Sequence, residues 1–101
     1  SSNIFMVSKG MLSTHPLTPR ILSGVTRGEI LSVCREEGDL VIEGYFNKDD
    51  LYAADEAFLT GTITEVLPVT IVDGQPIGTG KPGPVTRRLQ AAYHKRIGAT
   101  S

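Results

Sequence analysis

Two short stretches of this sequence have the residue types that bind a phosphate through backbone amides. The first is Gly24-Val25-Thr26, where a glycine precedes the predicted start of a helix. Amide groups at a helix start have no acceptor within the helix and carry a partial positive charge, so they bind anions well. The second is Thr60-Gly61-Thr62, which places a glycine between two hydroxyls after an apolar run. Together they suggest one phosphate site, although the first stretch alone would also fit an ordinary capped surface helix.

The helix after the first stretch is predicted to begin at Thr26 and to end at Glu37. Thr26 and Glu29 have the spacing of a capping box, in which each side chain binds the backbone amide of the other residue. Gly38 follows in the position where a glycine commonly ends a helix. Apolar residues recur along one face of the predicted helix, and Cys34 is among them. We therefore interpret Cys34 as a core residue rather than a nucleophile.

Strands and two further helices are predicted around this helix, with five or six strands in all. The expected strands cover residues 3–7, 11–14, 40–46, 57–59 and 66–72. Asp73-Gly74 is a strong signal for a tight hairpin. A short helix is expected at 49–54 with Asn47 as its cap, and a long one from Pro84 to residue 97. This mixture of helices and strands predicts an α/β or α+β fold.

Composition argues against several classes of function. Ten basic and eleven acidic residues give a formal net charge of −1, so neither nucleic acid nor an anionic membrane is an expected partner. No apolar run approaches the roughly eighteen residues of a membrane span. One cysteine allows no internal disulfide, so a reducing, cytoplasmic compartment is expected. No metal site is expected either, because Asp49 and Asp50 lie in a predicted first helical turn, where they offset the helix dipole.

The chain is expected to form a single partial domain over residues 1–101. Its 101 residues fit one small domain or a piece of a larger one. The sequence starts directly in a predicted strand, with no methionine and no polar leader before it. We therefore expect a fragment whose true beginning lies elsewhere.

Four segments, in order and spacing, resemble the C-terminal part of class IV (fold type IV) pyridoxal-phosphate aminotransferases. This is the family of branched-chain and D-amino acid aminotransferases. The segments are Ser2-Asn3-Ile4-Phe5, Ser23-Gly24-Val25-Thr26-Arg27, residues 54–62 and residues 80–90. The resemblance covers nearly the whole chain. It implies the C-terminal part of the large, cofactor-binding domain of a D-amino acid aminotransferase-like enzyme that forms a homodimer.

The resemblance also implies which residues bind the cofactor, pyridoxal 5'-phosphate. They are Leu22, Gly24, Val25, Thr26, Thr62 and Asn3. The amides of Val25 and Thr26 and the hydroxyls of Thr26 and Thr62 would bind the phosphate. Leu22 would pack on the pyridine ring, and Asn3 follows the position of a glutamate that pairs with the ring nitrogen.

Substrate contacts are implied for Gly61, Thr62 and Ile63, where the amides of Thr62 and Ile63 would face the substrate carboxylate. Ile63 replaces the small residue usual in the family, so its bulk would narrow the pocket. The expected reaction transfers an amino group between an amino acid and 2-oxoglutarate. Because the Thr-Gly-Thr turn resembles that of the branched-chain enzymes, a branched-chain amino acid is the expected substrate. A D-amino acid aminotransferase or amine transaminase of the same fold stays an alternative. So does a non-catalytic phosphate-binding or interaction module.

The lysine that transamination requires is not expected in this chain. Transamination needs a lysine amine that bonds the cofactor and moves a proton at the substrate α-carbon. The lysines present match no catalytic position of the family; they are Lys9, Lys48, Lys81 and Lys95. In the family, the lysine and the acid near the ring nitrogen lie on strands before the position of Ser1. We therefore expect the remainder of the enzyme to supply them and the chain alone to be inactive.

Overall fold

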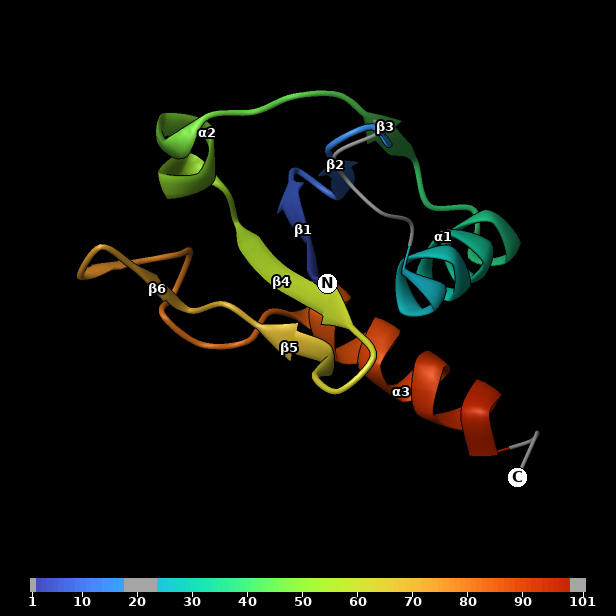
Figure 1. Ribbon diagram of the computed structural model, residues 1–101. Coiled ribbons are helices and arrows are strands. Elements are labelled where there is room, and N and C mark those ends of the chain that lie inside the picture. Colours follow the sequence, from blue (N-terminus) through green and yellow to red (C-terminus); the bar gives the residue numbers. More distant parts are fainter. Residues whose placement is uncertain (1, 18–23, 99–101) are drawn as a thin grey trace.

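The computed structural model describes residues 2–17 and 24–98, which form a five-stranded sheet, a small two-stranded sheet and three helices (Figure 1). The strands are β1 (Ser2–Ser8), β2 (Met11–Thr14), β3 (Val41–Glu43), β4 (Glu56–Gly61), β5 (Glu65–Pro68), β6 (Ile71–Val72) and β7 (Gln75–Pro76). The helices are α1 (Val25–Glu37), α2 (Lys48–Ala53) and α3 (Pro84–Gly98). Mixed helix and sheet of this kind confirms the predicted fold class.

Strand β1 lies at the centre of the larger sheet, whose order is β3-β2-β1-β4-β5. It pairs antiparallel with β2 and with β4, whereas β3 pairs parallel with β2 at one edge. Along β1, Asn3, Phe5 and Val7 are buried while the residues between them are half-buried. Phe5 faces Phe58 of β4, and their rings stack with centroids 4.9 Å apart. Alternate side chains of β1 therefore enter the main core, as the two-residue period of a strand requires.

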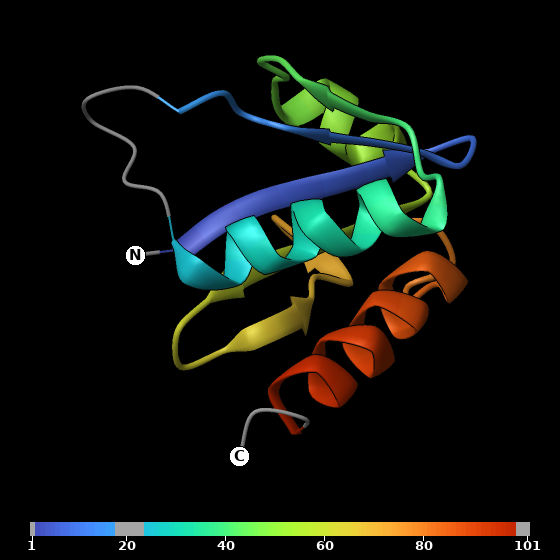
Figure 2. The ribbon, with the colours of Figure 1, turned by 90° about the vertical axis from the view of Figure 1, so that its right-hand side faces the viewer.

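Helices α1 and α3 cover one face of this sheet, and Figure 2 shows both on the same side of β1. The main core between them and the sheet consists of Phe5, Val7, Leu12, Ile30, Val33, Cys34, Phe58, Val66, Leu89 and Tyr93. A smaller core of Leu51, Ala54, Ala57 and Ile77 lies on the side of the sheet away from α1, where α2 and the β6–β7 hairpin pack (Figure 1). Cys34 is fully buried, which confirms its interpretation as a core residue.

Ion pairs join α1 to α3 across the outside of the main core. Arg88 of α3 binds Glu37 and donates to the carboxylate of Asp39 at 2.7 Å. Arg96, two turns further along α3, donates to Glu29 at 2.5 Å. The two helices are thus connected by ion pairs near both ends of their contact.

The start of α1 differs from the prediction. The helix begins at Val25 with Gly24 as its N-cap, in an extended conformation with φ −83° and ψ 148°, and no side chain caps it. The hydroxyl of Thr26 donates to the carbonyl of Gly61, and Glu29 accepts from Arg96. The capping-box prediction is therefore wrong, because partners from distant elements take both side chains. The end is confirmed, with Gly38 in the left-handed conformation at φ 80°.

Other local predictions are confirmed. Asn47 caps α2 in a complete capping box, since its side chain accepts from the Asp50 amide while the Asp50 carboxylate accepts from the Asn47 amide. Asp73 and Gly74 form the β6–β7 hairpin turn with φ values of 51° and 77°, as the Asp-Gly signal predicts.

Strand bounds were predicted less well, and the described residues hold seven strands rather than five or six. The strand expected at 40–46 is confined to β3, because its partner β2 is only four residues long. The strand expected at 66–72 divides into β5, which pairs with β4 and ends at Pro68, and β6, which pairs with β7 instead. The strand expected at 57–59 is longer and runs to Gly61, so Thr60 and Gly61 belong to β4 and only residues 62–64 form the turn.

Candidate functional site

The two stretches that predict a phosphate site are in direct contact. The hydroxyl of Thr26, in the first turn of α1, donates to the carbonyl oxygen of Gly61 at 3.0 Å, where β4 ends. Thr26 is only 2% exposed. The amide nitrogen of Thr62 is bonded to the same carbonyl carbon, so standard bond lengths put it within about 5–6 Å of the Thr26 hydroxyl. A helix start and a strand end therefore lie side by side although 35 residues separate them.

Asn3 lies against the helix start from the central strand. It pairs with Thr60 in the sheet and is 6% exposed. A Cβ added to Gly24 would lie 3.3 Å from the Asn3 side-chain oxygen, so these two residues are in close approach. That oxygen is buried and has no hydrogen-bond partner in the part of the chain that the structure describes. An amide offers an acceptor or, after a half-turn, a donor, so Asn3 can bind a polar ligand at this point.

A depression of about 320 Å³ lies at the same end of the sheet, lined by Ser2, Gly61, Thr62, Ile63 and Thr64. Residues 62–64 form the exposed turn between β4 and β5. The side chain of Ile63 is 95% exposed and is not part of the core. Of the predicted substrate residues, Thr62 and Ile63 are therefore exposed, whereas Gly61 is buried against the start of α1.

The hydroxyl of Thr26 has a different partner from the predicted one. We expected it to bind the phosphate, but its proton goes to Gly61, and its oxygen also lies 3.3 Å from the hydroxyl of Tyr93. In this structure it joins two parts of the protein instead of presenting a free donor. The amides of Val25 and Thr26 and the Thr62 hydroxyl stay predictions. Leu22, predicted to pack on a pyridine ring, lies outside the described residues.

Sequence reasoning missed Arg27 as a residue that fixes the helix start. Its side chain is 2% exposed and forms a 2.6 Å ion pair with Glu43 at the end of β3. The same terminal nitrogen donates to the carbonyl of His15, 3.2 Å away, just after β2. Its Nε has no hydrogen-bond partner among the residues that the structure describes. The Arg27 guanidinium therefore joins the first turn of α1 to the ends of two strands.

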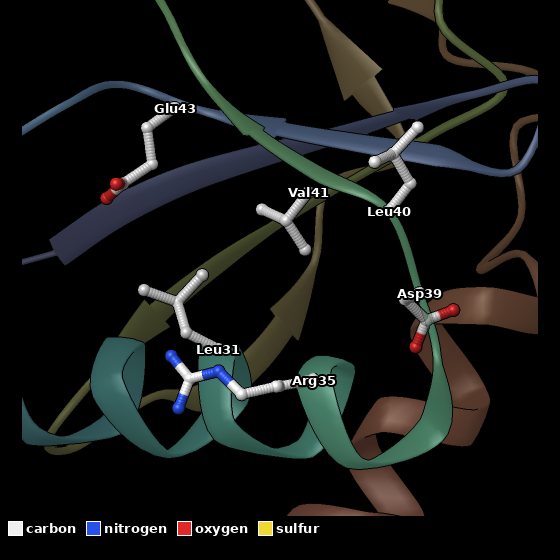
Figure 3. A pocket seen from close by; sticks show the side chains of 6 residues that line it. All are labelled: Leu31, Arg35, Asp39, Leu40, Val41 and Glu43. Atoms are coloured by element: carbon white, nitrogen blue, oxygen red, sulfur yellow. The ribbon is translucent and has the colours of Figure 1, made fainter.

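Another groove, of about 340 Å³, lies between α1 and β3 and contains none of the predicted site residues (Figure 3). It is lined by Leu31, Arg35, Asp39, Leu40, Val41 and Glu43. Over residues 2–17 and 24–98, no group of acidic, histidine and cysteine side chains could hold a metal ion. None of the helices described there is long and apolar enough to cross a membrane.

Comparisons with known proteins show the family to which the chain belongs. A family model described as "Amino-transferase class IV" matches residues 1–72. A D-alanine aminotransferase from Bacillus licheniformis is 45% identical over 97 residues, which are 96% of this chain and 34% of that protein. A branched-chain-amino-acid aminotransferase from Pseudomonas aeruginosa is 46% identical over 91 residues, which are 90% of this chain and 29% of that protein.

Solved structures give the same result. A branched-chain amino acid aminotransferase from Thermobaculum terrenum, solved in its PLP-bound holo-form, superposes with a TM-score of 0.89 at 38% identity, over 96% of this chain and 32% of that one. The corresponding enzyme from Escherichia coli gives 0.89 at 42% identity, over 94% and 32%. The chain spans about a third of the length of the relatives it matches. By the family match and the shared fold, it belongs to the class IV aminotransferases.

Proposed function

We propose that this chain is the C-terminal part of the cofactor-binding domain of a pyridoxal-phosphate-dependent aminotransferase. Its own contribution is a set of backbone and hydroxyl groups for the cofactor phosphate and the substrate carboxylate. The observation that carries this proposal is the 3.0 Å hydrogen bond from Thr26 to Gly61, which holds a helix start beside the turn at 62–64. Similarity to branched-chain and D-alanine aminotransferases supports the reaction class.

The residues at the helix start fit a phosphate group. A phosphate ester carries nearly two negative charges, and a helix start offers roughly half an elementary charge of opposite sign, so further donors are required. Thr62 is exposed and adds a hydroxyl donor beside Gly61, and the Asn3 side-chain oxygen, which has no partner among the described residues, is a further polar group at this point. Gly24 keeps side-chain atoms away from the amides. When bound, the cofactor supplies an electron sink for the substrate α-carbon.

The substrate carboxylate would be held by the amides of Thr62 and Ile63 in the exposed turn. A branched-chain amino acid and 2-oxoglutarate are the proposed substrates, because branched-chain aminotransferases are similar both in sequence and in structure. A D-amino acid is the second candidate, since a D-alanine aminotransferase matches with 45% identity. The exposed side chain of Ile63 would contact the substrate and restrict its size.

The lysine that bonds the cofactor would come from the remainder of the enzyme. Lys9, Lys48, Lys81 and Lys95 are all exposed. Lys9 follows the last residue of β1 while Asn3 is near its beginning, so the two are separated by roughly 20 Å at 3.3 Å per residue. Because the chain spans about a third of its relatives, we propose that the other two thirds supply the lysine and the acid for the ring nitrogen. We further propose that the enzyme is a cytoplasmic homodimer.

Replacing Thr62 in the enzyme that contains this chain tests the proposal. A hydrogen bond to a charged group is worth about 1.5–3 kcal/mol, so Thr62→Ala should raise the dissociation constant for pyridoxal 5'-phosphate about ten- to a hundredfold. Absorbance titration of the cofactor-free enzyme measures that constant. Thr79→Ala, in the loop between β7 and α3, is the matched control and should leave it unchanged. Equal affinities for the two variants would contradict the proposed phosphate site.

Assays with amino donors test the reaction itself. Transfer from L-leucine to 2-oxoglutarate supports the branched-chain assignment, and transfer from D-alanine alone supports the second candidate. Cofactor binding without transfer from either donor would instead favour a phosphate-binding module that has no catalytic role.

A further inference from the structure

A chain of hydrogen bonds runs from α3 through the start of α1 to the end of β4. The hydroxyl of Tyr93 lies 3.3 Å from that of Thr26, which is 3.0 Å from the carbonyl oxygen of Gly61. A carbonyl only accepts, so the single proton of Thr26 goes to Gly61. Tyr93 must then be the donor to Thr26. Because the carbonyl of Gly61 can only accept, both hydrogen bonds are donated in the same direction, from Tyr93 to Thr26 and from Thr26 to Gly61.

Tyr93 restricts the side chain of Thr26. A threonine hydroxyl in a helix divides between two rotamers, because it can also bond a carbonyl of its own helix. Thr26 and Tyr93 are 2% and 7% exposed, so water has little access to either hydroxyl. A buried acceptor that loses its donor is destabilised. The Tyr93 hydroxyl thus favours the rotamer in which Thr26 binds Gly61.

The same face of α3 also holds the far side of the turn at 62–64. The Gln90 amide donates to the carbonyl of Val66 at 3.0 Å, and the His94 ring lies 2.8 Å from the Glu65 carboxylate. Positions 90, 93 and 94 lie on one helix face by their three- and four-residue spacing. Ile63, at the middle of the turn, gives no apolar anchor because its side chain is exposed. Polar contacts with α3 therefore hold the Glu65–Val66 end of the turn directly and the Gly61 end through Thr26.

We propose that Tyr93 is a positioning residue for the phosphate site. Through Thr26 it sets the distance between the amides of α1 and the turn that carries Thr62, without touching the ligand itself. This inference rests on the proposed function, since it concerns how the same site is held in shape. In this inference α3 contributes no group to the phosphate site, but it holds the start of α1 and the turn at 62–64 close together.

Tyr93→Phe in the enzyme that contains this chain tests the inference. The variant keeps the buried ring and removes only the hydroxyl. We expect the dissociation constant for pyridoxal 5'-phosphate to rise about two- to tenfold, which corresponds to the loss of one neutral hydrogen bond. Pyridoxal, which has no phosphate, should bind both enzymes equally. A general loss of packing would weaken the two ligands alike, so an equal effect on both would overturn the inference.

A double-mutant cycle tests whether the effect passes through Thr26. In a Thr26→Val background, which has no hydroxyl to receive the bond, adding Tyr93→Phe should cause no further loss of cofactor affinity. An additional two- to tenfold loss would overturn the proposed route. Tyr52→Phe is the matched control, because its hydroxyl donates to Asp73 on an exposed surface of the protein and its loss should not change cofactor binding.

The outcomes separate this inference from the function on which it rests. A parent enzyme that binds no pyridoxal 5'-phosphate would refute the proposed function and the inference together. A parent enzyme that binds it, with Tyr93→Phe unchanged, would refute the inference alone.

Discussion

Glu56 holds the start of α3, and its replacement by glutamine should be strongly destabilising. It is the first residue of β4 and is 6% exposed. Its carboxylate accepts from the amides of Val85 at 3.2 Å and Thr86 at 2.7 Å, in the first turn of α3. A Cβ added to Gly83, just before this helix, would lie 2.1 Å from the Glu56 side chain. A carboxylate from the sheet therefore takes the place that a capping side chain would occupy.

The expected loss can be estimated from these two bonds. Glutamine keeps one acceptor oxygen but turns an NH₂ group toward the second amide, so one charge-assisted bond, worth about 1.5–3 kcal/mol, is lost. The negative charge at the helix start is lost as well, and in a partly buried site this costs up to about 2 kcal/mol. Because these terms overlap, we expect Glu56→Gln to lower the free energy of unfolding by about 2–4 kcal/mol, a large fraction of the stability of a typical domain.

Urea unfolding followed by circular dichroism measures this loss, and Asp55→Asn is the matched control. Asp55 also accepts a backbone amide, that of Lys9 at 2.7 Å, but it is exposed. Its replacement should therefore cost no more than about 1 kcal/mol, because water substitutes for an exposed partner. If Glu56→Gln is no more destabilising than Asp55→Asn, the interpretation of Glu56 as the cap of α3 is refuted.

Two further predictions concern backbone space and pH. Gly78→Ala should cost more than about 2 kcal/mol, since φ is +58° and the new Cβ would lie 2.1 Å from the Asp55 carbonyl oxygen. At Gly28, inside α1, a new Cβ would have no neighbouring atom within 4 Å, so Gly28→Ala should instead raise the free energy of unfolding by up to about 1 kcal/mol. If urea unfolding shows that both substitutions change the stability in the same direction, this reasoning is wrong. Burial raises the pKa of the Cys34 thiol from 9.0 to about 12, so the unfolded chain loses its proton first and stability should fall as pH rises between these values. Unfolding at pH 8 to 11 should show a shallower fall for Cys34→Ala, and identical slopes would refute this.

Local signals predicted structure well where both partners lie within a few residues. Asn47 caps α2 as the sequence predicts, and Asp73-Gly74 forms the predicted hairpin turn. Thr26 and Glu29 have the same capping-box spacing but did not form one. Their partners, Gly61 and Arg96, are 35 and 67 residues away in the sequence. Contacts over such separations depend on the tertiary fold, so local sequence patterns do not predict them.

The sequence predicted that the two stretches proposed to bind a phosphate lie together, from glycine placement, helix signals and family resemblance. It did not predict the groups that hold them together. Tyr93 was predictable only as a buried residue on the apolar face of its helix. Its hydroxyl contact with Thr26 depends on how α3 packs beside α1, which involves residues far apart in the sequence. Asn3 lies opposite Thr60, and its side-chain oxygen has no hydrogen-bond partner among the described residues; no local sequence pattern specifies either feature.

The three helix starts within the described residues are treated differently, and this difference bears on function. Asn47 caps α2 with its own side chain, and Glu56 caps α3 from the neighbouring sheet. α1 begins at Val25, after the N-cap Gly24 and without a side-chain cap, and the hydroxyl of Thr26 in its first turn donates to Gly61. A capping side chain would occupy the amides that an anion needs. A side-chain cap stabilises a helix that has only a structural role. The start of α1 has no such cap, and its Thr26 hydroxyl bonds to Gly61, so its free amides are the arrangement expected where a bound ligand accepts their hydrogen bonds.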